Sequence, residues 1–549
     1  MQVVYEGEER TINEPCTIRE AFQDKINELG SQNIIAARFN NQVESLDYQI
    51  VKDGKVELLD KISRDGRYIY IRGCLYIMSK AFSEVYPSAL LTVNYQLSNA
   101  MFCEVDNMEV TDEMIDKVRT RMQEIIAKDL PITKVQMTQE EAEEFYKRES
   151  SLKGRLQTDS TKEYVSLYYC EDYYNYFYGV MPATTGVINL VDIEKFLNGF
   201  IVKYPSTTEP NEISKAEQNR LKQVSAMEEY KEIYKIMGVN TVHKLNKAIR
   251  EGRMKELILF SEAIHERKIA EIAQRIKVRE NDVKIILIAG PSSSGKTTFA
   301  NKLGMGLRVL GIRPVTLSTD NYFVEREQNP KDEKGNYDFE CIEAIDTKLL
   351  NDHLQKLMNG EEVELPTFDF LLGTKKYNGN KLKLEKDQVL VMEGIHCLND
   401  KLTELIPPEK KFKIYISDLT VLNIDYYNRI STTDTRLIRR MVRDFNFRGY
   451  SALHTLQMWY SVNRGETKNI FPYQETADVM FNSSIVYEIA ALKKYAMPLL
   501  EDISPEVPEY SEAQRLLNMI RYFDDVDCDL IPNTSLLREF IGGSLFDVY

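Results

Sequence analysis

The stretch NDVKIILIAGPSSSGKTTFAN, residues 281–301, decides the fold of the C-terminal half of this chain. Its apolar run Ile285–Ala289 has the composition of a buried strand. The run leads into GPSSSGKT (290–297), the G-x-x-x-x-G-K-[ST] pattern of a phosphate-binding loop. Thr298–Leu310 is expected to form the helix that follows. Strand, loop and helix stand in the order that this motif requires, which predicts binding of ATP or GTP.

Each part of the loop has an expected task. Its two glycines let the backbone wrap closely, so that N–H groups and the helix N-terminus face phosphate oxygens. Lys296 is expected to bridge the outer phosphates, and the Thr297 hydroxyl to bind Mg²⁺. The predicted nucleotide-binding residues are Gly290, Ser292, Ser293, Ser294, Gly295, Lys296, Thr297 and Thr298.

Length and composition bound the function. A chain of 549 residues has room for several domains, and 43% hydrophobic with 28% charged residues is ordinary for a globular protein. No apolar run is long enough for a membrane span, the first residues lack the basic and apolar regions of a secretory signal, and seven scattered cysteines lack C-x-x-C spacing. These features predict a cytoplasmic protein. The net charge of −15 makes nucleic acid and anionic membranes unfavourable partners.

Further apolar strands are expected after the loop. They occupy Pro314–Thr319, Val389–Glu393, Phe412–Ser417 and Asp478–Asn482, with helical stretches between most of them. Such alternation predicts an α/β fold, a parallel sheet covered by helices on both faces. Ligands are then expected at the carboxyl ends of the strands.

Seven segments in this half resemble the uridine kinase/phosphoribulokinase family of P-loop kinases. They are GPSSSGKTT (290–298), STDNYF (318–323), YDFECIEAID (337–346), PTFDF (366–370), VLVMEGIH (389–396), RLIRRMVRDFNFRG (436–449) and ADV (477–479). They follow the family's order over about 210 residues, which implies the P-loop kinase fold and phosphoryl transfer to a hydroxyl.

The resemblance implies a role for each matching residue. Asp320 matches the general base, with Lys296, Arg443 and Arg448 as the catalytic cations on the phosphates. Glu393, which ends an apolar strand, is expected to reach Mg²⁺ beside Thr297. The matches to nucleoside-binding positions are Tyr322, Asp338, Phe368 and Arg440.

Other charged residues of these segments have less specific expectations. Arg436 and Arg439 are expected to be surface or salt-bridge residues. His396 lies close enough in sequence to Glu393 to approach the site, although a structural role is the commoner one for such a histidine.

Two departures from the family leave the acceptor open. The position of a base-reading histidine in uridine kinases holds Gly373, and the last arginine of the family's lid cluster is replaced by Tyr450. A pyrimidine nucleoside is the leading acceptor. The alternatives are a sugar phosphate, held by lysines in 371–386 such as Lys375, Lys376, Lys381 and Lys383, and a nucleotide-gated regulatory protein without acceptor activity.

TINEPCTIREAF (11–22) and VKDGKVELLD (51–60) resemble the TGS domain of threonyl-tRNA synthetases, a ubiquitin-like β-grasp, over residues 1–60. RGCLYIMSKAFSEVYP (72–87) and LYYCEDYYNYFYGVMP (167–182) resemble the ligand-carrying segments of the same family's amino-acid editing module, over residues 61–205. Residues 1–60 contain 12 acidic residues against 6 basic ones, which disfavours RNA binding by this segment.

The resemblance also locates the editing module's metal ligands. Those positions hold Tyr76, Lys80, Phe177 and Met181, so we expect no zinc site and no editing chemistry. The tyrosines between 164 and 178 are expected to serve core and interface packing rather than base stacking.

Two more regions complete the predicted organisation. Residues 206–280 are expected to form a helical arm, with helices over Glu212–Met237 and Val242–Ile276, and the kinase domain then covers 281–500. Residues 501–549 form a C-terminal helical extension, with helices over Ser511–Tyr522 and Ser535–Phe540, for docking or contact between copies. The sequence as a whole predicts a Mg²⁺- and ATP-dependent kinase of a small molecule.

Overall fold

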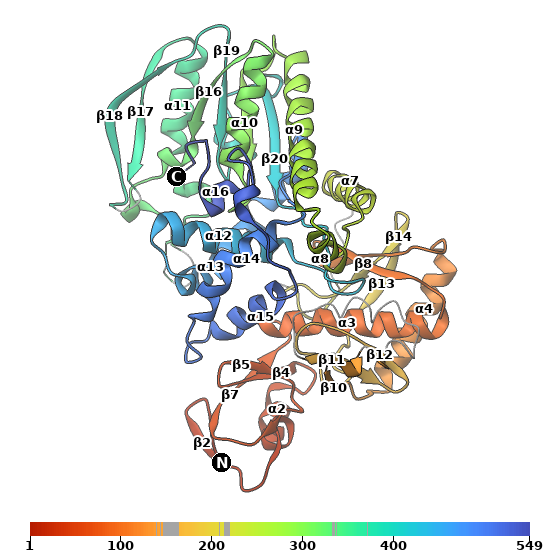
Figure 1. The fold of residues 1–549 in the computed structure, drawn as a ribbon. Coiled ribbons are helices and arrows are strands. Elements are labelled where there is room, and N and C mark those ends of the chain that lie inside the picture. The colour runs from red at the N-terminus through yellow and green to blue at the C-terminus, as the bar shows by residue number, and fades with distance from the viewer. Residues whose placement is uncertain are drawn as a thin grey trace.

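The computed structural model describes residues 1–138, 140–142, 144–145, 164–207, 209–213, 220–331, 335, 337–369 and 372–548. Parts of the segments expected above lie outside these residues: 139, 143 and 146–163 of the second module, 208 and 214–219 of the arm, 332–334, 336, 370 and 371 of the kinase domain, and 549. The N-terminal module lies at the bottom of Figure 1, and the sheet that carries the phosphate-binding loop lies at the top.

The C-terminal half is built on a five-stranded, entirely parallel sheet. Its strand order is β16 (Arg313–Ser318), β19 (Gln388–Glu393), β15 (Ile285–Ala289), β20 (Lys411–Ser417) and β21 (Val479–Asn482). The predicted parallel sheet is confirmed, and each expected strand lies within one residue of an observed one.

Helices cover both faces of this sheet, as alternate residues of β15 demonstrate. Ile286 and Ile288 belong to a core cluster with residues of α9, α10, α12 and α14, whereas Ile285 and Leu287 belong to another with α11. Because side chains alternate across a strand, a fully apolar strand needs apolar cover on both sides.

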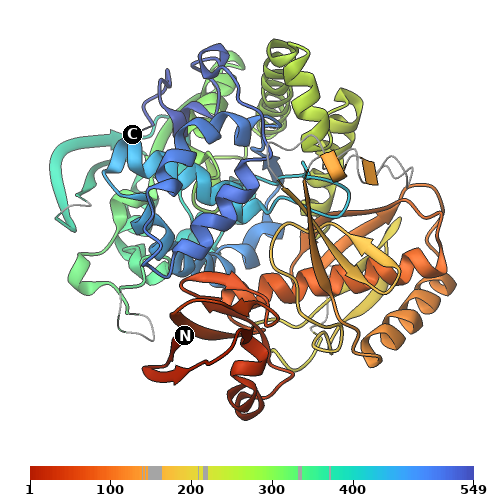
Figure 2. The same cartoon turned by 60° about the horizontal axis from the view of Figure 1, so that its bottom comes forward.

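The remaining elements of this half surround the sheet. The helices are α10 (Lys296–Val309), α11 (Thr347–Met358), α12 (Thr432–Arg448), α13 (Ala452–Asn469), α14 (Glu488–Glu501), α15 (Tyr510–Ile520) and α16 (Arg538–Ile541). Short 3₁₀ turns are η1 (Thr319–Tyr322), η2 (Arg326–Gln328), η3 (Ile342–Ala344), η4 (Asp400–Thr403), η5 (Pro408–Lys410), η6 (Phe471–Thr476) and η7 (Cys528–Leu530). A hairpin of β17 (Glu362–Asp369) and β18 (Thr374–Lys383) projects at the left of both views (Figures 1 and 2).

Helix boundaries differ slightly from the expected ones. Helix α10 begins at Lys296 rather than at residue 298, because Gly295 in the left-handed region ends the loop and acts as its N-cap. The helix expected from residue 535 covers only Arg538–Ile541. The core does not stop at residue 500, since buried residues of α14, α15 and α16 share one cluster with the sheet.

The helical arm consists of α7 (Leu221–Met237), α8 (Val242–Arg250) and α9 (Met254–Val278). Two expectations were wrong: residues 212 and 213 are not helical, and the long second helix is broken. Gly252, with φ +77°, adopts a left-handed conformation between α8 and α9. Helix α9 packs against α10. Helix α7 bonds both to the N-terminal part of the chain and to the kinase sheet: Glu228 of α7 accepts from the Tyr95 hydroxyl at 2.8 Å, and the Tyr230 hydroxyl of α7 donates to the Asn482 carbonyl at 2.8 Å.

The first module has a mixed five-stranded sheet in the order β2-β1-β7-β4-β5, with β1 parallel to β7. Its elements are β1 (Gln2–Tyr5), β2 (Glu8–Thr11), β3 (Cys16–Thr17), α1 (Ile18–Ala21), α2 (Gln23–Leu29), β4 (Ile34–Phe39), β5 (Gln42–Glu44), β6 (Gln49–Ile50) and β7 (Gly54–Asp60). The module is α+β, and its likeness to a TGS domain stays a prediction.

The second module packs helices α3 (Arg64–Val85) and α4 (Asp112–Ala127) beside two antiparallel sheets. One sheet contains β8 (Leu91–Leu97), β9 (Ala100–Val105), β13 (Asp192–Phe196) and β14 (Gly199–Lys203), and the other β10 (Thr133–Thr138), β11 (Tyr164–Cys170) and β12 (Tyr173–Asn175). Figure 2 shows this module beside the first one. Its likeness to an editing module also stays a prediction.

The four positions matched to metal ligands lie together in this module's core. The Tyr76 hydroxyl donates to the Tyr168 carbonyl at 3.0 Å, and Lys80 Nζ bonds to Glu84 at 2.7 Å and to the Cys170 carbonyl at 3.1 Å. Phe177 and Met181 are buried. These side chains are therefore engaged in packing and hydrogen bonding. Among the described residues, no helix has the length and apolar character of a membrane span.

Candidate active site

The phosphate-binding loop connects β15 to α10 and follows a tightly constrained path. Ser293 has φ +59° and Gly295 φ +85°, which turn successive backbone groups toward one side. A Cβ on Gly290 would lie 2.0 Å from the Ile416 carbonyl oxygen, so only glycine fits there. The Ser293 and Ser294 hydroxyls are buried and have no hydrogen-bond partner among the described residues. Unpaired donors inside such a loop fit phosphate oxygens.

Lys296 and Thr297 begin helix α10 at the mouth of the loop. Lys296 Nζ donates to the Gly290 carbonyl at 3.0 Å and to the Pro291 carbonyl at 3.1 Å, so the ammonium group folds over the loop. Thr297 is half-buried. Thr298 differs from both: its N–H and hydroxyl donate to Glu539 of α16 at 3.1 and 2.7 Å. A carboxylate from the C-terminal extension thus occupies donors that were predicted to bind nucleotide.

Two carboxylates lie at the neighbouring ends of β16 and β19. Ser318 is in register with Glu393, and its hydroxyl donates to Glu393 Oε1 at 3.4 Å. Asp320 follows two residues later in η1, with an exposed side chain. Partial loss of hydration raises the pKa of Asp320, while the charges of Lys296, Arg448 and Arg443 oppose the rise.

Glu393 has an environment that suits a metal ligand. Burial and the negative charge of Asp320 raise the pKa of Glu393 to about 7, against the effect of Lys296. A carboxylate whose ionised form lacks enough compensation is a good partner for a divalent cation. Glu393 together with the Thr297 hydroxyl offers the oxygen ligands that Mg²⁺ prefers.

Helix α12 contributes the arginines, and one carboxylate gathers three of them. Asp444 accepts from Arg443 Nε at 2.9 Å and from Arg440 Nε at 3.2 Å, and it lies 3.6 Å from Arg448 Nε. Arg440 also donates to the Ser292 hydroxyl at 3.0 Å, which ties the helix to the loop. Burial lowers the pKa of Arg443, with Arg448 acting in the same direction. The predicted phosphate arginines are thus brought together.

Arg436 and Arg439 form salt bridges as expected, but they are not surface residues. Both are almost fully buried beneath the loop. Arg436 pairs with Glu466 through two bonds of 2.6 and 2.8 Å and donates to the Ser292 carbonyl, and Arg439 pairs with Glu488. Buried guanidinium groups need such partners, because burial of an unpaired charge is costly.

The residues matched to nucleoside contacts differ in how deeply they are buried. Tyr322 is buried, and its hydroxyl bonds to His353 Nδ1 at 3.0 Å, so it belongs to the core in this conformation. Phe368 is half-buried beside Phe323, with ring centroids 5.6 Å apart. Asp338 is half-buried and accepts from the Glu340 N–H at 3.1 Å.

Glu340 is a carboxylate that the motif comparison missed. Burial and the negative charge of Glu466 raise the pKa of Glu340 to about 7, while Arg440 and Lys296 act to lower it. These charges connect Glu340 with the loop and with α12. Glu340 therefore belongs to the electrostatic environment of the same site.

The structure gives a physical reason for Gly373. This residue has φ +72° in the turn between β17 and β18, and a Cβ there would lie 2.7 Å from Arg326 Cβ. A histidine is thus excluded by both backbone and space. Tyr450 is exposed, with its ring stacked on His454.

His396 and three of the lysines considered above present no uncompensated charge to the site. His396 is buried, and burial lowers its pKa to about 4, which keeps the imidazole neutral near pH 7. Lys375, Lys376 and Lys381 pair with Asp346, Asp369 and Glu362. Their charges are already compensated.

Glu466, Glu539 and Asp444 were also missed as parts of the site. Glu466 Oε1 accepts from the Ser292 N–H at 2.8 Å, and Asp444 lies within the quoted segment RLIRRMVRDFNFRG. The available signal was the presence of arginines on the apolar side of a helix, which requires buried acidic partners.

The part of the chain that holds this site is similar in sequence to known proteins. A profile of the phosphoribulokinase/uridine kinase family matches residues 285–490. A uridine kinase of Halalkalibacterium halodurans is 30% identical over 198 residues, covering 36% of this chain and 84% of that protein. The chain belongs to this family. A uridine kinase of Staphylococcus aureus is 29% identical over 197 residues, 36% of this chain and 86% of that protein.

Similarity to solved structures is weaker. One from Bacillus stearothermophilus, described as a possible uridine kinase, is 19% identical with a TM-score of 0.25, covering 36% of this chain and 89% of that one. The YGR205w protein is 15% identical with a TM-score of 0.25, covering 34% and 78%. Membership in the phosphoribulokinase/uridine kinase family makes the C-terminal half an ATP-dependent phosphotransferase.

Proposed function

We propose that this protein is a nucleoside kinase that transfers the γ-phosphoryl group of ATP to the 5′-hydroxyl of a pyrimidine nucleoside. The observation that carries the proposal is the meeting of Asp320, Glu393 and the phosphate-binding loop at one edge of the sheet. Two similar proteins, from Halalkalibacterium halodurans and Staphylococcus aureus, are named uridine kinases.

The reaction requires a base, an electrophile and charge neutralisation. Asp320 takes the proton from the acceptor hydroxyl as its oxygen bonds to the γ-phosphorus, and the bond to the β-phosphate oxygen breaks to release ADP. The raised pKa of Asp320 makes its carboxylate a better proton acceptor. Lys296, Arg443 and Arg448 stabilise the negative charge that spreads over the phosphoryl oxygens.

The nucleotide and metal are held by the loop and its neighbours. Ser292, Ser293, Ser294 and Gly295 provide the cradle, and Thr297 with Glu393 would hold Mg²⁺, which supplies further charge neutralisation when bound. Thr298 can join only after Glu539 releases it.

Acceptor recognition involves Asp338, Phe368 and Arg440, with Glu340 as an additional acceptor for ribose hydroxyls. Tyr322 supports this wall from the core. A sugar phosphate is a weaker candidate, because three of the lysines considered for its phosphate already form ion pairs. A purely regulatory role leaves Asp320 and the α12 arginines without a purpose.

An acceptor panel tests the proposal. Purified protein with ATP and Mg²⁺ is offered uridine, cytidine, purine nucleosides and sugar phosphates, and the products are identified by mass. We expect a nucleoside monophosphate and ADP in equal amounts from a pyrimidine nucleoside. Turnover with a sugar phosphate alone would replace the nucleoside by that acceptor, and acceptor-independent ATP hydrolysis would favour the regulatory alternative.

A further inference from the structure

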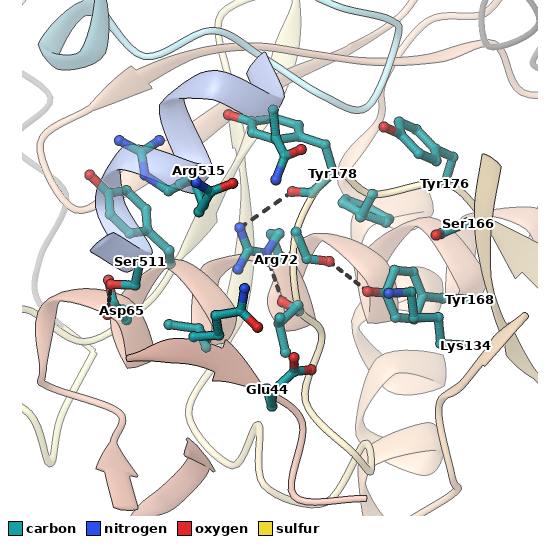
Figure 3. Close-up of a pocket in the computed structure, with 18 of the residues that line it drawn as sticks. Glu44, Asp65, Arg72, Lys134, Ser166, Tyr168, Tyr176, Tyr178, Ser511 and Arg515 are labelled. Atoms are coloured by element: carbon teal, nitrogen blue, oxygen red, sulfur yellow. Dashed lines mark hydrogen bonds between the residues drawn. The ribbon is translucent and has the colours of Figure 1, made fainter. Parts of the chain in front are cut away.

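A cavity of about 410 Å³ lies outside the candidate active site, and none of its lining residues belongs to the phosphate-binding loop. Its walls come from β5 of the first module, from α3, β10 and β11 of the second, and from α15 of the C-terminal extension. The volume is within the range of small-molecule sites. Figure 3 shows its polar side chains converging from these separate elements.

Aromatic rings form much of the cavity wall. The tyrosines are Tyr68, Tyr164, Tyr168, Tyr176, Tyr178 and Tyr522. Two of their hydroxyls are already engaged, since the Tyr168 hydroxyl donates to the Gly179 carbonyl at 2.6 Å and the Tyr178 hydroxyl to the Arg429 carbonyl at 3.5 Å. The rings are thus held in place as flat surfaces, which suit a planar ligand.

Arg72 lies in the middle of this cavity (Figure 3). Its Nε donates to the Val180 carbonyl at 3.0 Å and its Nη1 to the Tyr178 carbonyl at 3.4 Å. No described carboxylate lies within 4 Å of its guanidinium group, and Nη2 has no hydrogen-bond partner among the described residues. A Cβ on Gly179 would lie 2.6 Å from Arg72 Nη1, so glycine at this position makes room for the charge.

The other charges of the cavity are mostly compensated. Arg515 pairs with Asp434 and Glu512, and Asp65 pairs with Arg38. Glu44 and the exposed Lys134 line the same cavity, and burial raises the pKa of Glu44 while Lys134 opposes that rise. The guanidinium of Arg72 therefore remains as the inner charge that lacks an acidic partner. An anion would supply one.

We propose that this cavity binds a small anion carrying a planar ring, with its negative group on Arg72 and its ring among the tyrosines, and that its binding alters the affinity of the kinase site for ATP. The chemistry includes nucleotides and aromatic phosphates or carboxylates.

Direct bonds connect this cavity to the helix of the phosphate arginines. Arg515 donates two hydrogen bonds to Asp434, at 2.7 and 2.6 Å, and Asp434 lies in the first turn of α12. The Tyr178 hydroxyl bonds to the Arg429 carbonyl at 3.5 Å, just before that helix. A ligand that shifts α15 or Tyr178 therefore acts on the start of α12, whose far end carries Arg440, Arg443 and Arg448.

Calorimetric titration with three probes tests the site. Phenyl phosphate and benzoate are the anionic probes and benzyl alcohol is the neutral one, added to the full chain carrying Lys296→Ala to weaken binding at the loop. We expect saturable binding of an anionic probe and at least about tenfold weaker binding of benzyl alcohol. Arg72→Gln should weaken the binding of the anionic probe by at least about tenfold, because the substitution removes a charge-assisted contact.

Two further variants separate the site from general damage. Asn518→Trp, on the exposed side of α15, fills the cavity while leaving Arg72 in place, and should weaken binding similarly. Arg121→Gln replaces an arginine of α4 that pairs with Glu84, outside the cavity, and should bind as the parent does. Absence of saturable binding by both anions, equal binding by Arg72→Gln, or equal affinity for benzyl alcohol would overturn the site.

The effect on the kinase site is measured with Lys296 intact. Saturating phenyl phosphate should change the ATP dissociation constant at least about threefold, and Arg72→Gln should abolish the change. This readout requires no turnover, so it can fail independently of the proposed reaction. Binding of the probe with no change in ATP affinity would overturn the coupling to the kinase site.

Discussion

Glu340 illustrates how burial sets the charge of a residue beside the phosphates. Its side chain is half-buried against α13, where a Cβ on Gly465 would lie 2.3 Å from Glu340 Cβ. Its pKa of about 7 exceeds the ordinary value of about 4.3 because desolvation and Glu466 outweigh Arg440 and Lys296. The folded protein therefore holds this proton more tightly than the unfolded chain does.

This shift predicts a pH-dependent stability. Between about pH 4.3 and 7 the native state binds more protons at Glu340, so this residue's contribution to stability falls as pH rises and is lowest above pH 7. Glu340→Gln should remove that loss. From pH 5 to pH 8 its free energy of unfolding should gain about 2 kcal/mol relative to wild type.

Calorimetry at both pH values measures this gain, with the exposed Glu343→Gln as a matched control. A Glu340→Gln variant with the same pH dependence as wild type would show that the pKa of this carboxyl is not raised.

The residues of the phosphate-binding loop were predictable because the residues that define the motif lie within about twenty positions of one another. Glu466 and Glu539 were not, because they reach Ser292 and Thr298 from 174 and 241 residues away.

At the scale of elements, α16 acts directly on the phosphate-binding loop. Leu536, just before this helix, fills the space beside Gly295, and Glu539 bonds to Thr298. Phe540 lies under Arg439, with the guanidinium 5.1 Å from the ring centroid. The sequence predicted a helix here but only a docking role, because a four-residue helix carries no motif that indicates its partner.

The negative charge of Glu539 should oppose ATP phosphates. Glu539→Gln keeps a hydrogen-bond acceptor for Thr298 and removes the charge, so ATP should bind at least about threefold more tightly. Titration at low and high salt measures the change, which should shrink as salt rises. Glu506→Gln, an exposed residue of the same extension, should leave the affinity unaltered. Weaker ATP binding in Glu539→Gln would mean that the carboxylate supports the loop instead of competing with phosphate.

At the scale of the whole molecule, the kinase sheet shares its core with neighbouring regions. One cluster joins Ile286 of β15 with Leu257 of the arm, Leu167 of the second module and Leu516 of α15. The strands and their cover by helices could be predicted from apolar periodicity, whereas the order of the strands in the sheet was not predicted. The extent of this core could not be predicted either, because contacts between distant segments leave no periodic pattern in the sequence.

Fragment stability tests this arrangement. Residues 281–500 alone should aggregate or unfold readily, because the faces that pack against α9, α15 and α16 would be exposed to water. Residues 220–549 should retain folded protein, since they include these helices. Expression of both fragments with circular dichroism and thermal melting provides the comparison. A cooperatively folding 281–500 fragment would show that the arm and extension are dispensable for stability.

The most direct test of the proposed kinase activity is the kcat of Asp320→Asn with ATP, Mg²⁺ and the best pyrimidine nucleoside. We expect a fall of at least about 10²-fold in kcat, since general-base help is typically worth 10²–10⁴-fold, with ATP affinity within about threefold of wild type. Asp387→Asn, an exposed aspartate before β19 at the opposite end of the strand, should retain wild-type kcat. A near-normal kcat for Asp320→Asn would contradict the assignment of the base at the edge of this sheet.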